Sequence, residues 1–218
     1  MCFSAPASFT VAAITGLAGA AAISRTSARR EIPLASVPLI FGTQQAIEGT
    51  LWLALGHENL SGWVTPLANA FIFSALVVWP VWAPVAAILV ERNRIRFLAM
   101  AVLLALAVVL VIRGVFGMWV QPYGACVVQN SISYGNGWPY APILFGAYVL
   151  CACCPFLLSS HKTLRLFGAI VLVGLIVSTT LYTYAYVSVW CFFGAVSSLT
   201  IYLHFARTPK EHAPALPR

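Results

Sequence analysis

Long apolar stretches follow one another along almost the whole chain, and this pattern constrains the fold more than any other feature. Of the 218 residues, 61% are hydrophobic and only 8% are charged, whereas roughly 25% of the residues of an average soluble domain are charged. A helix needs about 20 mostly apolar residues to cross a bilayer. The sequence therefore predicts an all-α membrane protein whose helices use nearly all of its length.

The apolar windows predict a bundle of seven transmembrane helices. The last two windows are separated by neither Gly nor Pro, so one long bent segment is an alternative there to a tight hairpin. We expect residues 1–207 to form a single bundle, and residues 208–218, with three prolines, to form a disordered cytoplasmic tail. The expected helices cover residues 6–23, 33–55, 65–90, 97–119, 140–158, 164–186 and 187–206.

The basic residues are unevenly distributed between the connections. All but one of the 12 Lys and Arg residues follow the first, third, fifth or seventh expected helix, and the other connections contain none. The positive-inside rule then puts the N-terminus outside and the C-terminus in the cytoplasm. The formal charge of +7 thus reflects topology in a lipid bilayer, and nucleic acid is not an expected partner. We expect a multi-pass protein of the cell membrane, in a bacterium the inner membrane.

Two charged side chains lie inside expected helices, Glu48 in the second and Arg113 in the fourth. Each costs about 2.5–3.5 kcal/mol at the centre of a membrane helix. Glu48 precedes Leu55 by seven residues and Arg113 precedes Trp119 by six, so both lie about 9–10 Å below the outer end of their helix. Their matching depth predicts that they can pair. The alternative is that Arg113 reaches the outer headgroups while Glu48 is protonated or bonds to a neighbour.

A polar stripe surrounds Glu48 on the second expected helix. Gln45, Glu48 and Trp52 follow one another at spacings of three and four, and Gln44 is also four residues from Glu48, so they share a helix face. Other polar and aromatic residues at comparable outer depth complete the expected pocket, although each of them can equally serve as an interhelical hydrogen bond. The candidate ligand-binding residues are Gln44, Gln45, Glu48, Trp52, Asn69, Arg113, Tyr184 and Trp190.

Cysteines on the outer side offer a second kind of site. Cys2, Cys126 and Cys191 map to the outer half, where oxidising conditions allow a disulfide, and Cys126 paired with Cys2 or with Cys191 is the expected bridge. Cys2, Glu48, His57 and Cys191 also have the ligand types of a soft metal site. No spacing motif supports that site, and a nucleophilic Cys2 with His57 as its base is a further alternative.

Three stretches of this sequence resemble one family. The opening Met1-Cys2-Phe3-Ser4-Ala5-Pro6-Ala7-Ser8-Phe9 is similar to that of an uncharacterised family of bacterial membrane proteins that begin MCFSA-x-ASF, with Pro6 at a position where a small polar residue is expected. Phe41-Gly42…Gln44-Gln45…Glu48-Gly49…Trp52 and Ser188-Val189-Trp190-Cys191-Phe192-Phe193 resemble the same family. The resemblance implies a small multi-helix membrane protein and implies no activity.

The function hypotheses follow from these residues. The first is binding or transport of a small polar ligand, an ion or a proton in an outward-facing pocket around Glu48 and Arg113. The alternatives are a membrane-embedded enzyme with a metal or thiol centre and an accessory membrane subunit whose polar groups only join helices. The sequence contains no P-loop, dinucleotide fingerprint or nucleophile elbow, so it identifies neither a cofactor nor a reaction.

Overall fold

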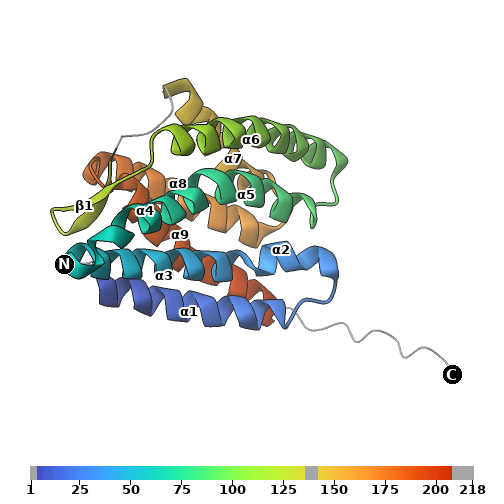
Figure 1. Ribbon diagram of the computed structural model, residues 1–218. Coiled ribbons are helices and arrows are strands. Elements are labelled where there is room, and N and C mark those ends of the chain that lie inside the picture. Colours follow the sequence, from blue (N-terminus) through green and yellow to red (C-terminus); the bar gives the residue numbers. More distant parts are fainter. Residues whose placement is uncertain (1–3, 136–141, 208–218) are drawn as a thin grey trace.

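A bundle of long helices with a short β-hairpin at one end forms the protein (Figure 1). The computed structural model describes residues 4–135 and 142–207, so Cys2 and the expected tail at 208–218 lie outside the described residues. The elements are α1 (Ala5–Ile23), α2 (Ile32–Ala35), α3 (Val37–Gly56), α4 (Val64–Phe73), α5 (Trp79–Ile88), α6 (Arg94–Val120), β1 (Ala125–Val128), β2 (Ser131–Tyr134), α7 (Pro142–Leu158), α8 (Lys162–Leu181) and α9 (Tyr186–Arg207).

The described residues are helical in each of the seven expected windows. α4 and α5 continue into one another through a π-helical turn at Ser74–Val78, as expected for a single window. α8 ends at Leu181, where Tyr182 leaves the helical conformation, and α9 begins at Tyr186. The tight connection between the last two helices is therefore confirmed, and the single bent segment is wrong.

Five helical segments of the described chain are long and apolar enough to cross a membrane: Ala5–Ile23, Glu58–Ile88, Arg94–Val120, Lys162–Leu181 and Tyr186–Arg207. The protein is therefore compatible with a multi-pass membrane protein. α3 has 20 residues but is not among the five, since Gln44, Gln45 and Glu48 lower its hydropathy. α7 is apolar but shorter.

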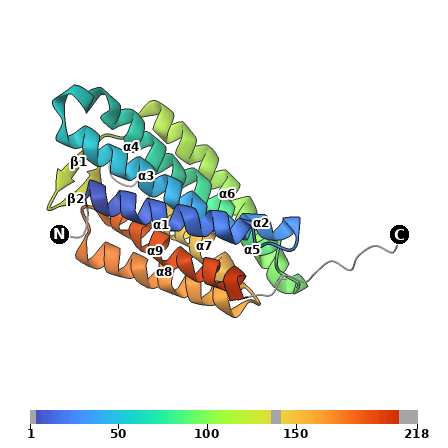
Figure 2. The same ribbon diagram turned by 90° about the horizontal axis from the view of Figure 1, so that it is seen from below.

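α1 packs on α3 and α9, along the face seen in Figure 2. The contact between α1 and α3 is close because a glycine of each helix faces the backbone of the other: Gly19 of α1 faces Leu39, and Gly42 of α3 faces Gly16. A Cβ on Gly42 would lie 2.8 Å from the backbone nitrogen of Gly16 and 3.0 Å from the carbonyl oxygen of Ala12. Small residues at Ala12 and Gly16 thus allow the two helices to approach closely.

The β-hairpin was not expected from the apolar pattern. Its two turn residues, Gln129 and Asn130, have positive φ angles of 46° and 61°, and Val128 pairs directly with Ser131. Two left-handed turn residues between antiparallel strands form a type I′ hairpin, a conformation that Asn tolerates well. β2 contacts α9, and its Ile132 is fully buried while Tyr134 stacks on Phe71 with ring centroids 4.8 Å apart. The hairpin therefore delivers side chains into one end of the bundle.

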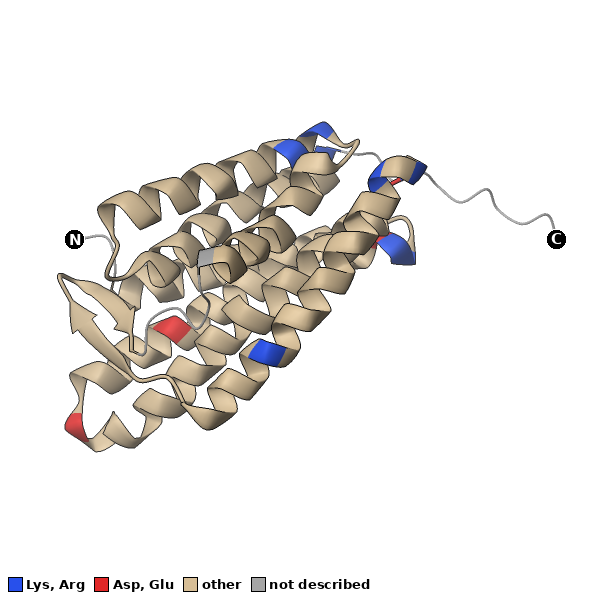
Figure 3. Cartoon of the chain, turned by 90° about the horizontal axis from the view of Figure 1, so that it is seen from above, with Lys and Arg blue, Asp and Glu red and all other residues tan. Residues whose placement is uncertain are grey.

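Most Lys and Arg residues lie at the opposite end, away from the two strands (Figure 3). At this basic end, Glu91 joins the connection before α6 to the connection before α8. Its carboxylate accepts hydrogen bonds from the backbone nitrogens of Arg92 and Asn93 at 2.9 and 2.8 Å. It also accepts from the backbone nitrogen and the hydroxyl of Ser160, both at 2.7 Å. Partial burial raises the pKa of Glu91, but these bonds, led by the one from Asn93, lower it by more, to about 2.

Glu91→Gln is expected to remove an acid-sensitive part of the stability. Because folding lowers the pKa of Glu91 from 4.5 to about 2, its contribution is complete above the unfolded value and is lost as the pH falls through the folded one. The unfolding midpoint of the wild type should exceed that of the variant at neutral pH, and the difference should shrink in acid. Thermal unfolding at a series of pH values measures it, with the exposed Glu58→Gln as control; a difference independent of pH contradicts the assignment.

Candidate functional site

Glu48 lies inside the bundle, where α3 meets α9 and β2, and is only 2% exposed. Three side chains donate hydrogen bonds to its carboxylate. The hydroxyl of Ser188 on α9 donates to Oε1 at 2.6 Å, and the phenol of Tyr134 on β2 donates to the same oxygen at 3.3 Å. The amide nitrogen of Gln45, one turn earlier on α3, donates to Oε2 at 3.2 Å. The buried carboxyl group is thus held by three separate elements of the fold.

These hydrogen-bond partners of Glu48 are all neutral. A buried carboxylate without a positive partner is strongly unfavourable in an apolar interior. The neighbouring Gln45 is fully buried, and its Oε1 has no hydrogen-bond partner among the described residues. An orphaned buried acceptor is also costly. The two groups together leave this region short of hydrogen-bond donors and of positive charge.

Tyr134 connects Glu48 to a cavity of about 350 Å³ at the hairpin end. Burial, followed by the nearby Glu48 and Cys191, raises the pKa of Tyr134 well above its ordinary value, so that its phenol keeps its proton. The cavity reaches the surface beside the exposed Thr183. Its polar and aromatic lining comes from the hairpin and from the segments before β1 and between α8 and α9: Tyr123, Ser133, Tyr134, Thr183, Tyr184 and Tyr186.

Gln44 forms a second buried hydrogen-bond set beside Glu48. Its Oε1 accepts from the indole nitrogen of Trp79 on α5 at 2.7 Å, and its amide nitrogen donates to the sulfur of Cys191 on α9 at 3.2 Å. All three residues are buried. The side chain of Gln44 therefore bridges α5 and α9 across the centre of the bundle.

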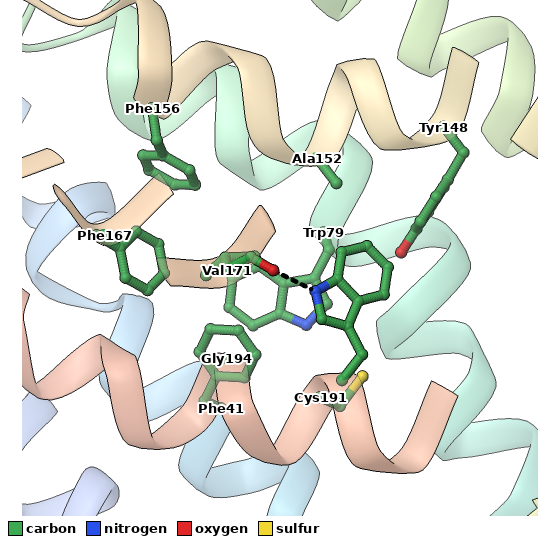
Figure 4. Close-up of a pocket in the computed structure, with 10 residues that line it drawn as sticks. Phe41, Trp79, Tyr148, Ala152, Phe156, Phe167, Val171, Cys191 and Gly194 are labelled. Carbon is green, nitrogen blue, oxygen red and sulfur yellow. Dashed lines mark hydrogen bonds between the residues drawn. The ribbon is translucent and has the colours of Figure 1, made fainter. Parts of the chain in front are cut away.

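An aromatic cavity of about 40 Å³ lies beside Trp79 and Cys191, the two hydrogen-bond partners of Gln44 (Figure 4). Phe41 stacks on Trp79 with ring centroids 3.8 Å apart, and the indole nitrogen of Trp190 donates to the carbonyl of Val171 at 2.9 Å. Phe41 is seven residues before Glu48, which is about 10 Å closer to the basic end. These rings therefore lie on the side of Glu48 towards the basic end. The cavity is lined by Phe41, Trp79, Tyr148, Ala152, Phe156, Phe167, Val171, Trp190, Cys191 and Gly194.

The other candidate ligand-binding residues fall in different environments. Asn69 holds the backbone of Tyr123, accepting from its nitrogen at 3.1 Å and donating to its oxygen at 3.0 Å, and so anchors the segment before β1. Trp52 packs at the edge of a small apolar cluster with Leu51. Tyr184 lines the cavity of the hairpin end, and Trp190 lines the aromatic cavity.

Arg113 does not join this site. It is exposed on α6, a helix that packs chiefly on α5 and α7, whereas Glu48 lies among α3, α9 and β2. The expected pairing of Arg113 with Glu48 is therefore wrong. Equal depth places two residues at the same level of a bundle but does not bring them to the same side of it.

Comparison with known protein families identifies the family to which this sequence belongs. The model of a family of unknown function, DUF6629, matches residues 1–215. The chain belongs to this family. The expected membership of an uncharacterised family is thereby confirmed. Searches of curated proteins and of solved structures each found no match. The DUF6629 membership assigns no activity, so the function has to be argued from the side chains themselves.

The cysteine and metal hypotheses find little support in this DUF6629 chain. Cys126 and Cys191 are both free thiols, so the expected bridge between these two is wrong, and a bridge to Cys2 lies outside the described residues. His57 is exposed at the end of α3 and its Nδ1 contacts the carbonyl of Leu53 at 2.9 Å. Within residues 4–135 and 142–207, no three His, Cys, Asp or Glu side chains are grouped so that they could hold a metal.

Tyr134, Ser188 and Trp79 were not among the candidates from the sequence. Ser188 stands at the start of the conspicuous Ser188-Val189-Trp190-Cys191 stretch, which is the signal that could have identified it. Tyr134 reaches Glu48 only through the pairing of β1 with β2, and Trp79 reaches Gln44 only through the packing of α5. Neither contact leaves a periodic pattern in the chain.

Proposed function

We propose that this protein binds a proton or a small cation at Glu48, within the membrane. The position of Tyr134 is the observation that carries the proposal, because the same phenol lines the large cavity and donates to the Glu48 carboxylate. A carboxylate that is buried among neutral donors requires a proton or a cation to balance its charge. The unpartnered oxygen of Gln45 adds an acceptor that a bound cation or hydrogen-bond donor can satisfy.

We further propose that the protein has a defined orientation in the membrane. The basic residues gather at the end opposite the hairpin (Figure 3), and the positive-inside rule assigns such an end to the cytoplasm. The cavity beside Tyr134 then opens to the outside, and Glu48 lies near that side of the membrane. α3 and α7 act as the two further spans, which makes seven with the five longer segments, in the cell membrane of a bacterium. α3 is covered by other helices, so its polar stripe does not have to face lipid.

Binding is favoured over transport in this conformation. The rings of Phe41, Trp79 and Trp190 lie on the side of Glu48 towards the basic end, and the cavity that Tyr134 lines is on the hairpin side, so we expect a bound cation to exchange through the hairpin side. Transport requires a second conformation in which these rings separate. Flux measurements in proteoliposomes distinguish a carrier from a binding protein.

Glu48→Gln is expected to abolish the dependence of stability on cations, and the part of its dependence on pH that does not come from Glu91. A group that takes up one proton on folding changes the unfolding free energy by up to about 1.4 kcal/mol per pH unit, and a bound cation stabilises in proportion to its occupancy. The purified protein is unfolded thermally across a pH series, and across sodium, lithium and ammonium at constant ionic strength. At pH values above the range in which Glu91 titrates, the wild type should respond to pH or to one of the cations, and Glu48→Gln should not.

Two matched variants serve as controls for this measurement. Glu58→Gln removes an exposed carboxyl group, and Arg113→Gln removes an exposed cation from the middle of α6; both should keep the full response of the wild type. If Glu48→Gln retains that response as well, the carboxyl group is only a structural hydrogen-bond acceptor. The protein is then better described as an accessory membrane subunit.

A further inference from the structure

A third cavity, of about 70 Å³, lies at the basic end of the bundle and is separate from the Glu48 site. Four segments far apart in the sequence meet around it: the turn before α2, the connection between α5 and α6, the start of α8 and the end of α9. A water molecule needs about 10–15 Å³ of such space, so the cavity has room for several waters or a small anion. Its lining residues are Arg30, Glu31, Leu34, Val90, Arg92, His161, His204 and Phe205.

The polar lining is rich in groups that donate to anions. Arg30 and Arg92 enter from different connections, and both are exposed to solvent. Among the described residues, the one carboxylate that lines the cavity is that of Glu31, and its Oε2 already accepts from the backbone nitrogens of Ser27 and Ala28 at 2.8 and 3.3 Å. The two guanidinium groups therefore outnumber the opposing charge.

Two histidines complete this lining. The rings of His161 and His204 lie 6.3 Å apart between centroids. His161 contacts the carbonyl of Val90 at 3.1 Å through Nε2, and His204 contacts the hydroxyl of Thr163 at 3.5 Å through Nδ1. These contacts hold both rings at the cavity wall, beside the two arginines.

The surroundings of the cavity resemble those of a phosphate at a membrane surface. Two of its lining residues, Val90 and Arg92, belong to the short connection between the apolar segments that end at Ile88 and begin at Arg94. Such a connection lies at the depth of lipid headgroups. Leu34 and Phe205 are buried and form its apolar side. The planar guanidinium group of arginine matches phosphate oxygens in geometry as well as in charge. Basic pockets between membrane helices bind anionic lipid headgroups.

We propose that this cavity binds a phosphate group through Arg30 and Arg92, with His161 and His204 beside it. The group is presented either by an anionic phospholipid or by a soluble phosphate compound. Both sources offer the same tetrahedral oxygens to the two arginines. The apolar side formed by Leu34 and Phe205 accommodates the carbon skeleton attached to the phosphate.

Paired arginine variants test the proposal. The double variant Arg30→Gln/Arg92→Gln removes both guanidinium groups of the cavity, and Arg29→Gln/Arg94→Gln removes the same charge from neighbours that do not line it. Full-length wild-type and variant proteins are unfolded thermally in phosphatidylcholine nanodiscs, with inorganic phosphate or chloride at equal ionic strength. The same proteins are then unfolded in nanodiscs that also contain phosphatidylglycerol. Occupancy should raise the unfolding midpoint by about 2–4 °C.

Each outcome has a definite meaning. If inorganic phosphate raises the midpoint of the wild type and of Arg29→Gln/Arg94→Gln but not of Arg30→Gln/Arg92→Gln, the site takes soluble phosphate. If only phosphatidylglycerol produces this pattern, the site takes a lipid headgroup. If neither raises the midpoint, or if the two double variants respond alike, the effect is absent or is unspecific charge attraction, and the proposal is overturned.

Discussion

Gly19→Ala is expected to push α1 away from α3 and to lower the free energy of unfolding by about 1–3 kcal/mol, the range for overpacked interiors. Gly19 is buried on the face of α1 that meets α3. A Cβ at this position would lie 2.6 Å from the Cβ and 2.7 Å from the Cα of Leu39, and closer still to its backbone nitrogen. Backbone atoms cannot rotate aside as a side chain can, so the helices themselves have to separate.

Gly16→Ala is the matched control, because it makes the same change on the same helix. A Cβ on Gly16 would meet no atom within 4 Å, and Ala is a better helix former than Gly by roughly 0.5–1 kcal/mol. Unfolding in detergent, followed by circular dichroism, should show Gly16→Ala equal to or more stable than the wild type and Gly19→Ala clearly less stable. Equal stability of the two variants would mean that α1 and α3 are not in backbone contact at Gly19.

Gln44→Leu is expected to destabilise the protein by about 1–3 kcal/mol, since it leaves a buried donor unsatisfied. Leucine is similar in size to glutamine but cannot accept from the indole nitrogen of Trp79 or donate to Cys191. Both partners are buried in the bundle, so bulk solvent does not replace the lost amide. The unfolding midpoint of the purified variant measures the loss.

A double-mutant cycle separates the hydrogen bond from changes in packing. Trp79→Phe removes the indole donor, and its own cost includes the space that the smaller ring leaves behind. If the bond between Gln44 and Trp79 is the main contribution, the combined variant should lose less stability than the sum of the two single variants. Additive losses would show that Gln44 acts through packing alone.

The helices could be predicted from the sequence because each apolar window independently has the length that a bilayer requires. The polar stripe of Gln44, Gln45 and Glu48 was likewise identifiable, since helical spacing alone puts these side chains on one face. All three are buried in the fold. Local periodicity was sufficient for this part of the site.

The partners of these residues could not be predicted in the same way. Ser188 and Tyr134 contact Glu48 from 140 and 86 residues further along the chain, and no local pattern records such pairings. Arg113 shows a related limit, because residue counting gives a position along a helix but not the direction in which the side chain points around the bundle. The hairpin was missed because its strands are only four residues each.

The sequence by itself determined a bundle of helices apolar enough to span a membrane, the position of these helices and a carboxyl group inside the second long helix, α3. Composition, window length and helical spacing are properties of neighbouring residues, so a linear chain displays them directly. Only the tertiary structure decided that Glu48 contacts Tyr134 and not Arg113, and that the basic connections enclose a cavity. These outcomes depend on the rotation of each helix about its axis and on which helices are adjacent, and both are set by side-chain packing across the whole bundle.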